Sequence, residues 1–150
     1  MRLVIQRVKS ASVKVVGTEK TVGKIGKGLF VLVGVKKGDK TEDAEMLAVK
    51  LSKLRVMADE NDKMNLTVSD VEGEFLVVSQ FTLYADTSGG NRPSFINAAL
   101  PDEAQKIYKH FVESLRKSLP ADGRVETGSF GDYMKIDAVL DGPVTIILEN

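Results

Sequence analysis

The sequence predicts an α/β fold, a single layered domain in which two main helices pack on a mixed, largely antiparallel sheet. Three observations lead to this prediction. β-branched runs separated by glycines extend from residue 2 to residue 35, two segments carry apolar side chains at helical spacing, and further β-branched runs lie between the helices and near the C-terminus. The length of 150 residues, without an internal repeat or linker, indicates one domain over residues 1–150.

The N-terminal part is predicted to consist of strands. Four β-branched runs follow one another at residues 2–8, 12–16, 21–25 and 29–35. Glycines, the residues most typical of turns, separate the later runs at positions 17, 26 and 28. We therefore expect an antiparallel meander.

Two amphipathic helices are predicted. Residues 42–55 carry apolar side chains at helical spacing and follow a possible N-cap at residues 39–41. The second helix begins at Pro101, a residue favoured in the first helical turn. Its apolar stripe consists of Ala104, Ile107, Tyr108, Phe111 and Leu115. Each stripe is expected to face the sheet.

The remaining strands are short. Residues 75–78 form an apolar run that predicts a buried strand ending at Ser79. Residues 64–71 are ambiguous, and two or three final strands are expected from Val125 onward. Gly142 and Pro143 predict a turn before the last run, at residues 144–148.

Charge and composition exclude several classes of protein. There is no cysteine, and 21 basic residues balance 21 acidic ones, which argues against a protein that coats long stretches of nucleic acid. A local basic patch can still grip one end of an RNA. The candidates for such a patch are Lys24, Lys27, Lys36, Lys37, Lys40 and Arg92. No apolar run approaches the length of a signal peptide or a membrane span, so we expect a cytoplasmic protein without membrane contact.

The sequence shows neither a recognisable catalytic triad nor a pattern of metal ligands, which are the usual signs of a hydrolytic site. The single histidine, His110, lies beside the apolar stripe of the second helix, where a structural or surface role is expected. No pattern of metal ligands occurs, and we expect no metal and no cofactor. The remaining candidates are backbone groups and the hydroxyls of Ser79 and Thr82. Those hydroxyls can equally cap a strand, and Phe81 can be either a core residue or the wall of a pocket.

Five strings, in order along the chain, are similar to those of the D-aminoacyl-tRNA deacylases, also known as D-tyrosyl-tRNA deacylases. They are residues 1–8, 79–86, 92–95, 130–131 with Met134, and 141–145. The resemblance runs essentially from end to end. It implies a homodimeric enzyme that hydrolyses the ester between a D-amino acid and the 3′ end of tRNA, a proofreading step in translation. Glycyl-tRNA is expected as a further substrate, since glycine has no side chain to exclude.

The resemblance also assigns residues to the site. It implies that the catalytic pocket is formed by Ser79, Gln80, Phe81 and Thr82, whose backbone amides orient the ester while the ribose 2′-hydroxyl of the tRNA helps to activate water. Further pocket residues would be Leu83, Pro93, Phe95, Phe130, Gly131 and Met134. Gly142 and Pro143, joined by a cis peptide in the family, would reject L-amino acids in the partner subunit's site. Arg7 matches the arginine that holds this turn.

Two other functions compete with this reading. The first is a non-catalytic nucleic-acid-binding protein on the same scaffold, which requires a basic tail or patch. The second is an esterase or amidohydrolase for small molecules, which the missing triad and metal ligands disfavour. We therefore expect tRNA, and not DNA, as the partner.

Overall fold

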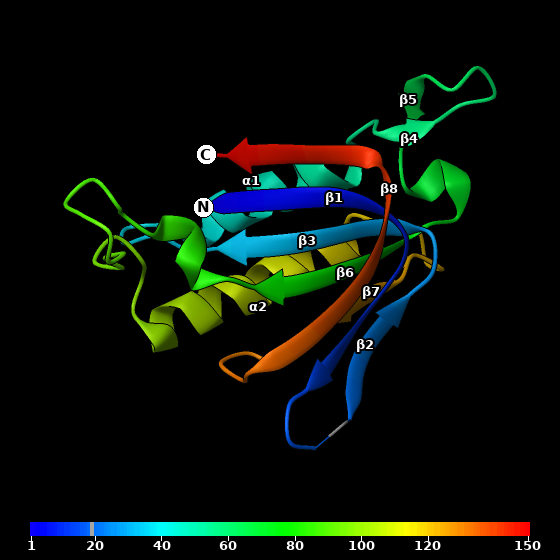
Figure 1. Ribbon diagram of the computed structural model, residues 1–150. Helices are drawn as coiled ribbons and strands as arrows, with labels where there is room; N and C mark the ends of the chain where they lie inside the picture. The colour runs from blue at the N-terminus through cyan, green and yellow to red at the C-terminus, as the bar shows by residue number, and fades with distance from the viewer. Residues whose placement is uncertain (19) are drawn as a thin grey trace.

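A computed structural model describes residues 1–18 and 20–150 and confirms the α/β fold. In Figure 1 a strongly bent mixed sheet lies in front of two helices. The sheet consists of six strands, which are β1 (Arg2–Val15), β2 (Thr21–Ile25), β3 (Gly28–Gly34), β6 (Glu74–Ser79), β7 (Val125–Thr127) and β8 (Met134–Glu149). β6 pairs in parallel with β3 and β7, whereas every pairing of β1 is antiparallel.

The predicted meander is wrong in two respects. β1 is a single strand of 14 residues where the sequence predicted two, and it separates β2 from β3. Its N-terminal half pairs with β3 and its C-terminal half with β2, while β8 runs along its other edge. Register irregularities against β8 fall between Gln6 and Ser10. Such bulges bend a strand without ending it, so the polar residues there do not mark a turn.

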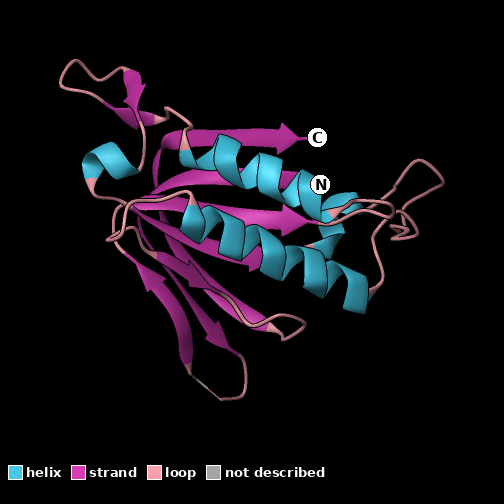
Figure 2. Cartoon of the chain, turned by 180° about the vertical axis from the view of Figure 1, so that it is seen from behind, coloured by secondary structure: helices cyan, strands magenta, loops and turns pink. Residues whose placement is uncertain are grey.

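Both predicted helices are present, with slightly different bounds. α1 spans Thr41–Ser52 and α2 spans Pro101–Lys117, and they lie side by side over one face of the sheet (Figure 2). Both buried stripes contribute to the main core, whose largest fully buried aromatic side chains are Phe75 and Phe111. Tyr108 donates a hydrogen bond of 2.9 Å from its hydroxyl to the carbonyl of Val77, which ties α2 to β6. Neither helix in the described chain is long and apolar enough to span a bilayer.

The N-cap of α1 falls inside the predicted range of residues 39–41. Its N-cap residue is Lys40, and the Asp43 carboxylate accepts the backbone N–H of Lys40 at 2.8 Å. That hydrogen bond is the main reason why the pKa of Asp43 lies below its usual value. Asp39, the preceding residue, is buried and accepts the backbone N–H of Lys36 at 2.7 Å and the ammonium of Met1 at 2.7 Å.

The ambiguous region holds short elements. β4 (Met57–Ala58) and β5 (Met64–Leu66) form a small separate hairpin, and the 3₁₀ turn η1 (Ser69–Val71) leads into β6. A second 3₁₀ turn, η2 (Phe81–Tyr84), follows β6 directly. The hairpin loop is closed by the carboxylate of Asp59, which accepts the backbone N–H groups of Asn61 and Lys63.

Glu72, which ends η1, has a left-handed backbone with φ of 51° and an exposed side chain. A residue with a Cβ is strained in this region, and glycine is not. We expect Glu72→Gly to raise the free energy of unfolding in urea by about 0.5–1 kcal/mol. Glu72→Ala is the matched control because it removes the charge and keeps the Cβ. Equal stabilisation by alanine would contradict the backbone explanation.

β8 carries the Gly142-Pro143 pair inside a strand instead of in a turn between strands. The pairing with β1 is irregular there, where Gln6 faces Thr145 and Val8 faces Leu140. Gly142 has φ of +135°, and an added Cβ would lie 2.6 Å from the backbone nitrogen of Val144, so only glycine fits. The peptide bond between Gly142 and Pro143 is cis.

Candidate functional site

The first part of the candidate site is the segment Ser79–Leu83, at the carboxyl end of β6. Ser79 is the last residue of the strand, and the backbone N–H of Gln80 still donates to the carbonyl of Val33 at 2.8 Å. The chain then turns into η2, which packs on Gly34 at the end of β3. A Cβ on Gly34 would lie 3.0 Å from the Cβ of Leu83, so the absence of a side chain there allows η2 to approach the sheet.

This local geometry leaves two backbone donors free. Leu83 and Ala85 donate their N–H groups within η2, to the carbonyls of Gln80 and Thr82. Within the described residues, the N–H groups of Phe81 and Thr82 have no acceptor, as the first amides of a helical turn generally do not. Two adjacent free amides can polarise an ester carbonyl and stabilise the oxyanion that forms on attack by water.

The hydroxyl of Thr82 is already engaged, since it accepts a hydrogen bond of 2.5 Å from Nε2 of Gln80. A threonine nucleophile needs a base that removes its proton. Gln80 is a donor in this contact and cannot serve as that base. The arrangement therefore favours binding and polarisation of a carbonyl over covalent catalysis by Thr82.

Aromatic rings form an apolar wall beside these amides. The ring of Phe81 is 57% exposed and makes an edge-to-face contact with Phe95, with centroids 5.0 Å apart. Phe95 belongs to a loop that closes where Asp86 and Ser94 exchange two backbone hydrogen bonds of 2.8 Å, and Pro93 lies next to this closure. Exposed rings that pack on each other suit a ligand with a flat face, such as a nucleoside base.

A second flank is formed by residues that follow β7. Phe130 packs on Tyr108 with ring centroids 5.8 Å apart, and Tyr108 in turn holds the carbonyl of Val77 in β6. Met134 packs with Val78, and its sulfur accepts the backbone N–H of Ser129 at 3.2 Å. Gly131 makes the intervening turn with φ of +81°. These contacts place the Phe130–Met134 stretch next to the end of β6, close to Ser79.

The structure adds two residues that the sequence did not indicate. Nη1 of Arg2 donates to the carbonyl of Leu83 at 2.7 Å, and its guanidinium lies 5.1 Å from the ring centroid of Tyr84. Burial, reinforced by the charge of Asp39, raises the pKa of Tyr84 to about 12, so its phenol remains a donor at neutral pH. Arg2 lies in one of the family strings, but no local pattern links it to Leu83.

The second part of the candidate site is Gly142 and Pro143 in the irregular middle of β8, a local feature that we call the Gly142-Pro143 turn although it does not separate two strands. Nε of Arg7 donates to the backbone carbonyl of Asp141 at 3.3 Å and lies 3.2 Å from its carboxylate. Nη1 of Arg7 donates to the carbonyl of Val56 at 2.9 Å. The Arg7 side chain is 12% exposed, whereas Gly142 and Pro143 are exposed. The largely buried Arg7 side chain therefore holds the turn through Asp141, and Gly142 and Pro143 themselves lie on the surface.

Within one chain the two parts are far apart. Ser79 is in register with Val33 and hence with Leu3, whereas Gly142 lies in the irregular stretch of β8 near Arg7, four residues further along β1. That offset is ~13 Å along the strands, and three steps from β8 to β6 add ~14 Å across them, or roughly 20 Å in all. A single chain does not bring Gly142 to Ser79.

The single histidine lies away from this site. His110 lies on α2, and its Nε2 is 2.7 Å from the carboxylate of Glu45 on α1, in the helical layer. In the part of the chain that the structure describes, no three His, Cys, Asp or Glu side chains are grouped so as to hold a metal ion.

The layered fold and a site of free amides and exposed aromatic rings define a small α/β protein suited to holding a nucleoside ester. A family model described as D-Tyr-tRNA(Tyr) deacylase matches residues 4–149. A D-aminoacyl-tRNA deacylase of Thermotoga petrophila is 55% identical over 151 residues, which cover 100% of this chain and 97% of the relative. One of Thermosipho melanesiensis is 51% identical, with the same coverage. The chain belongs to the D-aminoacyl-tRNA deacylase family, as its sequence indicated.

Solved structures share the fold. One described as a c-Myc DNA unwinding element binding protein has a TM-score of 0.91 and 39% identity, and the match covers 100% of this chain and 99% of the other. Another, described as a probable eukaryotic D-amino acid tRNA deacylase, has a TM-score of 0.80 and 17% identity, with 98% and 97% coverage. The second similarity shows the fold alone.

Proposed function

We propose that this protein hydrolyses the ester that joins a D-amino acid to the 3′ adenosine of tRNA, and that it acts in the cytoplasm as a proofreading enzyme. The observation that carries the proposal is the pair of free amides at Phe81 and Thr82, next to exposed aromatic rings, in a chain that matches the family model over residues 4–149. The amides suit the ester carbonyl and the rings suit the terminal adenosine.

The chemistry requires little from the side chains. The amides of Phe81 and Thr82 polarise the carbonyl, and the 2′-hydroxyl of the terminal ribose helps to activate the attacking water. This division of roles suits a site in which Gln80 occupies the hydroxyl of Thr82 and the histidine lies elsewhere. The RNA then supplies the polar group that the protein lacks.

We further propose that the enzyme is a homodimer in which Gly142 and Pro143 of one subunit enter the site of the other. The separation of roughly 20 Å within one chain supports this arrangement. β8 supports it too, because within the described residues it pairs with β1 alone and exposes Val139, Leu140 and Ile147 by 46–60%. A symmetric interface would cover this edge and those apolar side chains in both copies.

If the turn rejects L-amino acids by a clash with their side chains, it cannot reject glycine, which has no side chain. Glycyl-tRNA is therefore proposed as a further substrate, with a preference over L-aminoacyl-tRNA. A non-catalytic nucleic-acid-binding role remains the alternative function, and the name of one structural relative includes DNA binding. The net charge of zero does not favour that role here.

The decisive experiment compares D-tyrosyl-tRNA and L-tyrosyl-tRNA as substrates for the purified protein in excess chelator. We expect hydrolysis of the D-ester and persistence of the L-ester, because selectivity and chemistry both come from the chain and the RNA. His110→Ala is expected to retain activity within tenfold, since His110 contacts Glu45 in the helical layer. Binding of tRNA without hydrolysis of either ester would favour the alternative function.

A further inference from the structure

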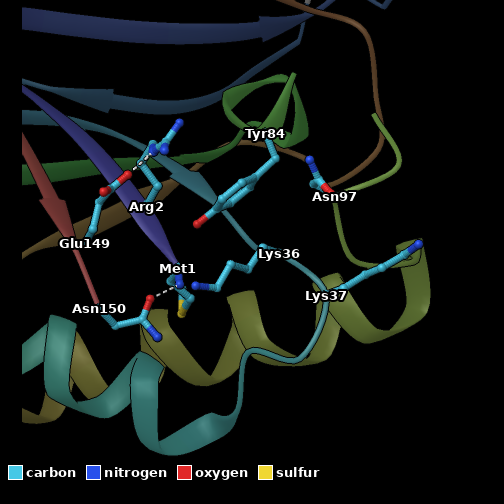
Figure 3. A pocket seen from close by; sticks show the side chains of 8 residues that line it. All are labelled: Met1, Arg2, Lys36, Lys37, Tyr84, Asn97, Glu149 and Asn150. Atoms are coloured by element: carbon cyan, nitrogen blue, oxygen red, sulfur yellow. Dashed lines mark hydrogen bonds and ion pairs between the residues drawn. The ribbon is translucent and has the colours of Figure 1, made fainter. Parts of the chain in front are cut away.

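A cavity of about 370 Å³ opens beside η2, on the opposite flank from Phe130 and Met134. Five segments line the cavity (Figure 3). They are the start of β1, the residues just after β3, the end of η2, the loop before α2 and the end of β8. The lining residues are Met1, Arg2, Lys36, Lys37, Tyr84, Asn97, Glu149 and Asn150. We refer to it as the lysine cavity. Its volume is in the range of ligand pockets.

The backbone N–H groups of Lys36 and Lys37 are hydrogen-bonded, whereas their side-chain ammonium groups are in no ion pair across the described residues. The backbone N–H of Lys36 donates to the buried carboxylate of Asp39 at 2.7 Å, and that of Lys37 donates to the carbonyl of Asn97 at 3.0 Å. Figure 3 shows the Lys36 side chain extending toward Met1 and that of Lys37 extending outward at the rim. One ammonium therefore lies among the lining side chains, beside Met1, and the other points away from them at the rim.

The lysine cavity carries an excess of positive charge. Arg2 is paired with Glu149, and the ammonium of Met1 with Asp39. Across the described residues, neither Lys36 nor Lys37 lies within ion-pair distance of a carboxylate. Neither ammonium group is therefore held in an ion pair, although the charge of Lys36 contributes to the lowered pKa of Asp43.

Neutral donors add to these charges. The hydroxyl of Tyr84 points between Arg2 and Lys36 (Figure 3). Asn97 supplies a carboxamide at the other side of the lining. A concave surface with two free cations, a phenol and an amide suits an anion with several acceptor oxygens.

Another cavity in the described residues can be compared with it. It has about 300 Å³ and one lysine, Lys24, whose lining partners include the acidic residue Asp137. Among the other cations that the sequence indicated as possible RNA contacts, Lys27, Lys40 and Arg92 line neither cavity. Lys24 is likewise in no ion pair across the described residues, so these two cavities differ in the number of lysines that line them, which is two in the lysine cavity and one in the other.

The position of the lysine cavity links it to the candidate site. Tyr84 is the last residue of η2, and Arg2 bridges from the cavity to the carbonyl of Leu83. A strand of RNA whose terminal adenosine lies against Phe81 and Phe95 has to leave the site past one of its flanks. Phe130 and Met134 fill the flank toward β7 with apolar groups, and the lysine cavity lies on the other.

We propose that the lysine cavity binds the phosphodiester groups of the unpaired 3′ strand of tRNA, immediately before the terminal adenosine. The inference rests on the proposed function and names where the RNA backbone is held. Lys36 and Lys37 neutralise the phosphates, and Tyr84 and Asn97 hydrogen-bond to their oxygens. Binding of this kind is weakened by salt, because the lysines displace counterions from the RNA.

The test compares three D-tyrosyl esters that differ only in their RNA, namely adenosine without phosphate, the trinucleotide CCA, and full-length tRNA. For the double variant Lys36→Gln and Lys37→Gln we expect KM to rise about tenfold with the trinucleotide and with tRNA, and to stay unchanged with the adenosine ester. The slope of log KM against log salt concentration is expected to fall by about 0.7 for each phosphate that the variant no longer neutralises. Lys50→Gln with Lys53→Gln, at the far end of α1, is the matched control.

The outcomes separate the two proposals. An unchanged KM for the trinucleotide in the double variant overturns the assignment of the lysine cavity, as does a rise of equal size with the adenosine ester. A rise confined to full-length tRNA overturns it too, since the cavity would then contact the acceptor stem. Failure of the unaltered protein to hydrolyse any of the three esters contradicts the proposed function itself.

Discussion

Replacing Arg7 with alanine is expected to raise hydrolysis of L-alanyl-tRNA about a hundredfold relative to D-alanyl-tRNA, equivalent to ~2.7 kcal/mol of discrimination. Enantiomers carry the same groups, so apolar affinity cannot separate them, and a rigid obstacle is needed. Arg7 fixes the Gly142-Pro143 turn through Asp141 on one side and Val56 on the other. Without it the turn can yield to an L side chain.

Three measurements accompany this prediction. Arg124→Ala is the control, because it removes an arginine that is also ion-paired, in this case with Glu74 and Glu126. It is expected to leave the ratio of D-alanyl-tRNA to L-alanyl-tRNA hydrolysis unchanged. Arg7→Lys keeps the charge but cannot reproduce the planar, two-sided hydrogen bonding of a guanidinium, and an intermediate ratio is expected. Far-ultraviolet circular dichroism verifies the fold of each variant. If Arg7→Ala is folded and its ratio equals that of the unaltered protein, the turn does not determine selectivity.

Gly34→Val is expected to lower kcat/KM for D-tyrosyl-tRNA at least a hundredfold, although it changes no group of the candidate site. A Cβ on Gly34 already lies 3.0 Å from the Cβ of Leu83 and 3.1 Å from the Tyr84 ring, and valine adds two methyl groups in the same direction. η2 then has to move outward, and the amides of Phe81 and Thr82 move with it. A displacement of about 1 Å at a reacting centre costs on the order of a hundredfold in rate.

The matched control is Gly89→Val, in the exposed loop after η2, where an added Cβ meets no atom within 4 Å. Its kcat/KM is expected to remain within twofold of the unaltered protein. Hydrolysis of D-tyrosyl-adenosine should fall as much as that of the tRNA ester in Gly34→Val, because the amides act on the ester and not on the RNA backbone. Near-normal activity of a folded Gly34→Val variant would mean that the position of η2 does not limit catalysis.

The sequence predicted best those parts of the fold that depend on local patterns. Pro101 and the apolar stripe behind it identified α2, and the buried run before Ser79 identified β6 with the correct end. Both signals come from neighbours along the chain, because a helix stripe and a strand pattern repeat within a few residues. The names of the candidate site residues came from the resemblance to a family and not from such patterns.

Contacts between distant segments were not predictable in this way. Arg2 and Leu83 are 81 residues apart, and their hydrogen bond depends on the pairing of β1, β3 and β6. The continuity of β1 was missed because a bulge has no fixed residue signature. The N-cap was predicted only as residues 39–41, and the partners that Asp39 has in the structure, Met1 and the N–H of Lys36, become visible only once the chain has folded.

β1 has a role that extends beyond the sheet, because the two arginines it carries serve different tasks. Arg2 holds the carbonyl of Leu83 in the segment where the ester is expected to bind, and Arg7 holds the turn expected to inspect the amino acid in the other subunit. The spacing of five residues between Arg2 and Arg7 on β1 therefore sets how the Leu83 segment and the Gly142-Pro143 turn are placed relative to each other. A change that shifts β1 as a whole alters turnover and stereochemical accuracy together. A change to either arginine alters one of them alone, so speed and fidelity can diverge in evolution without a new fold.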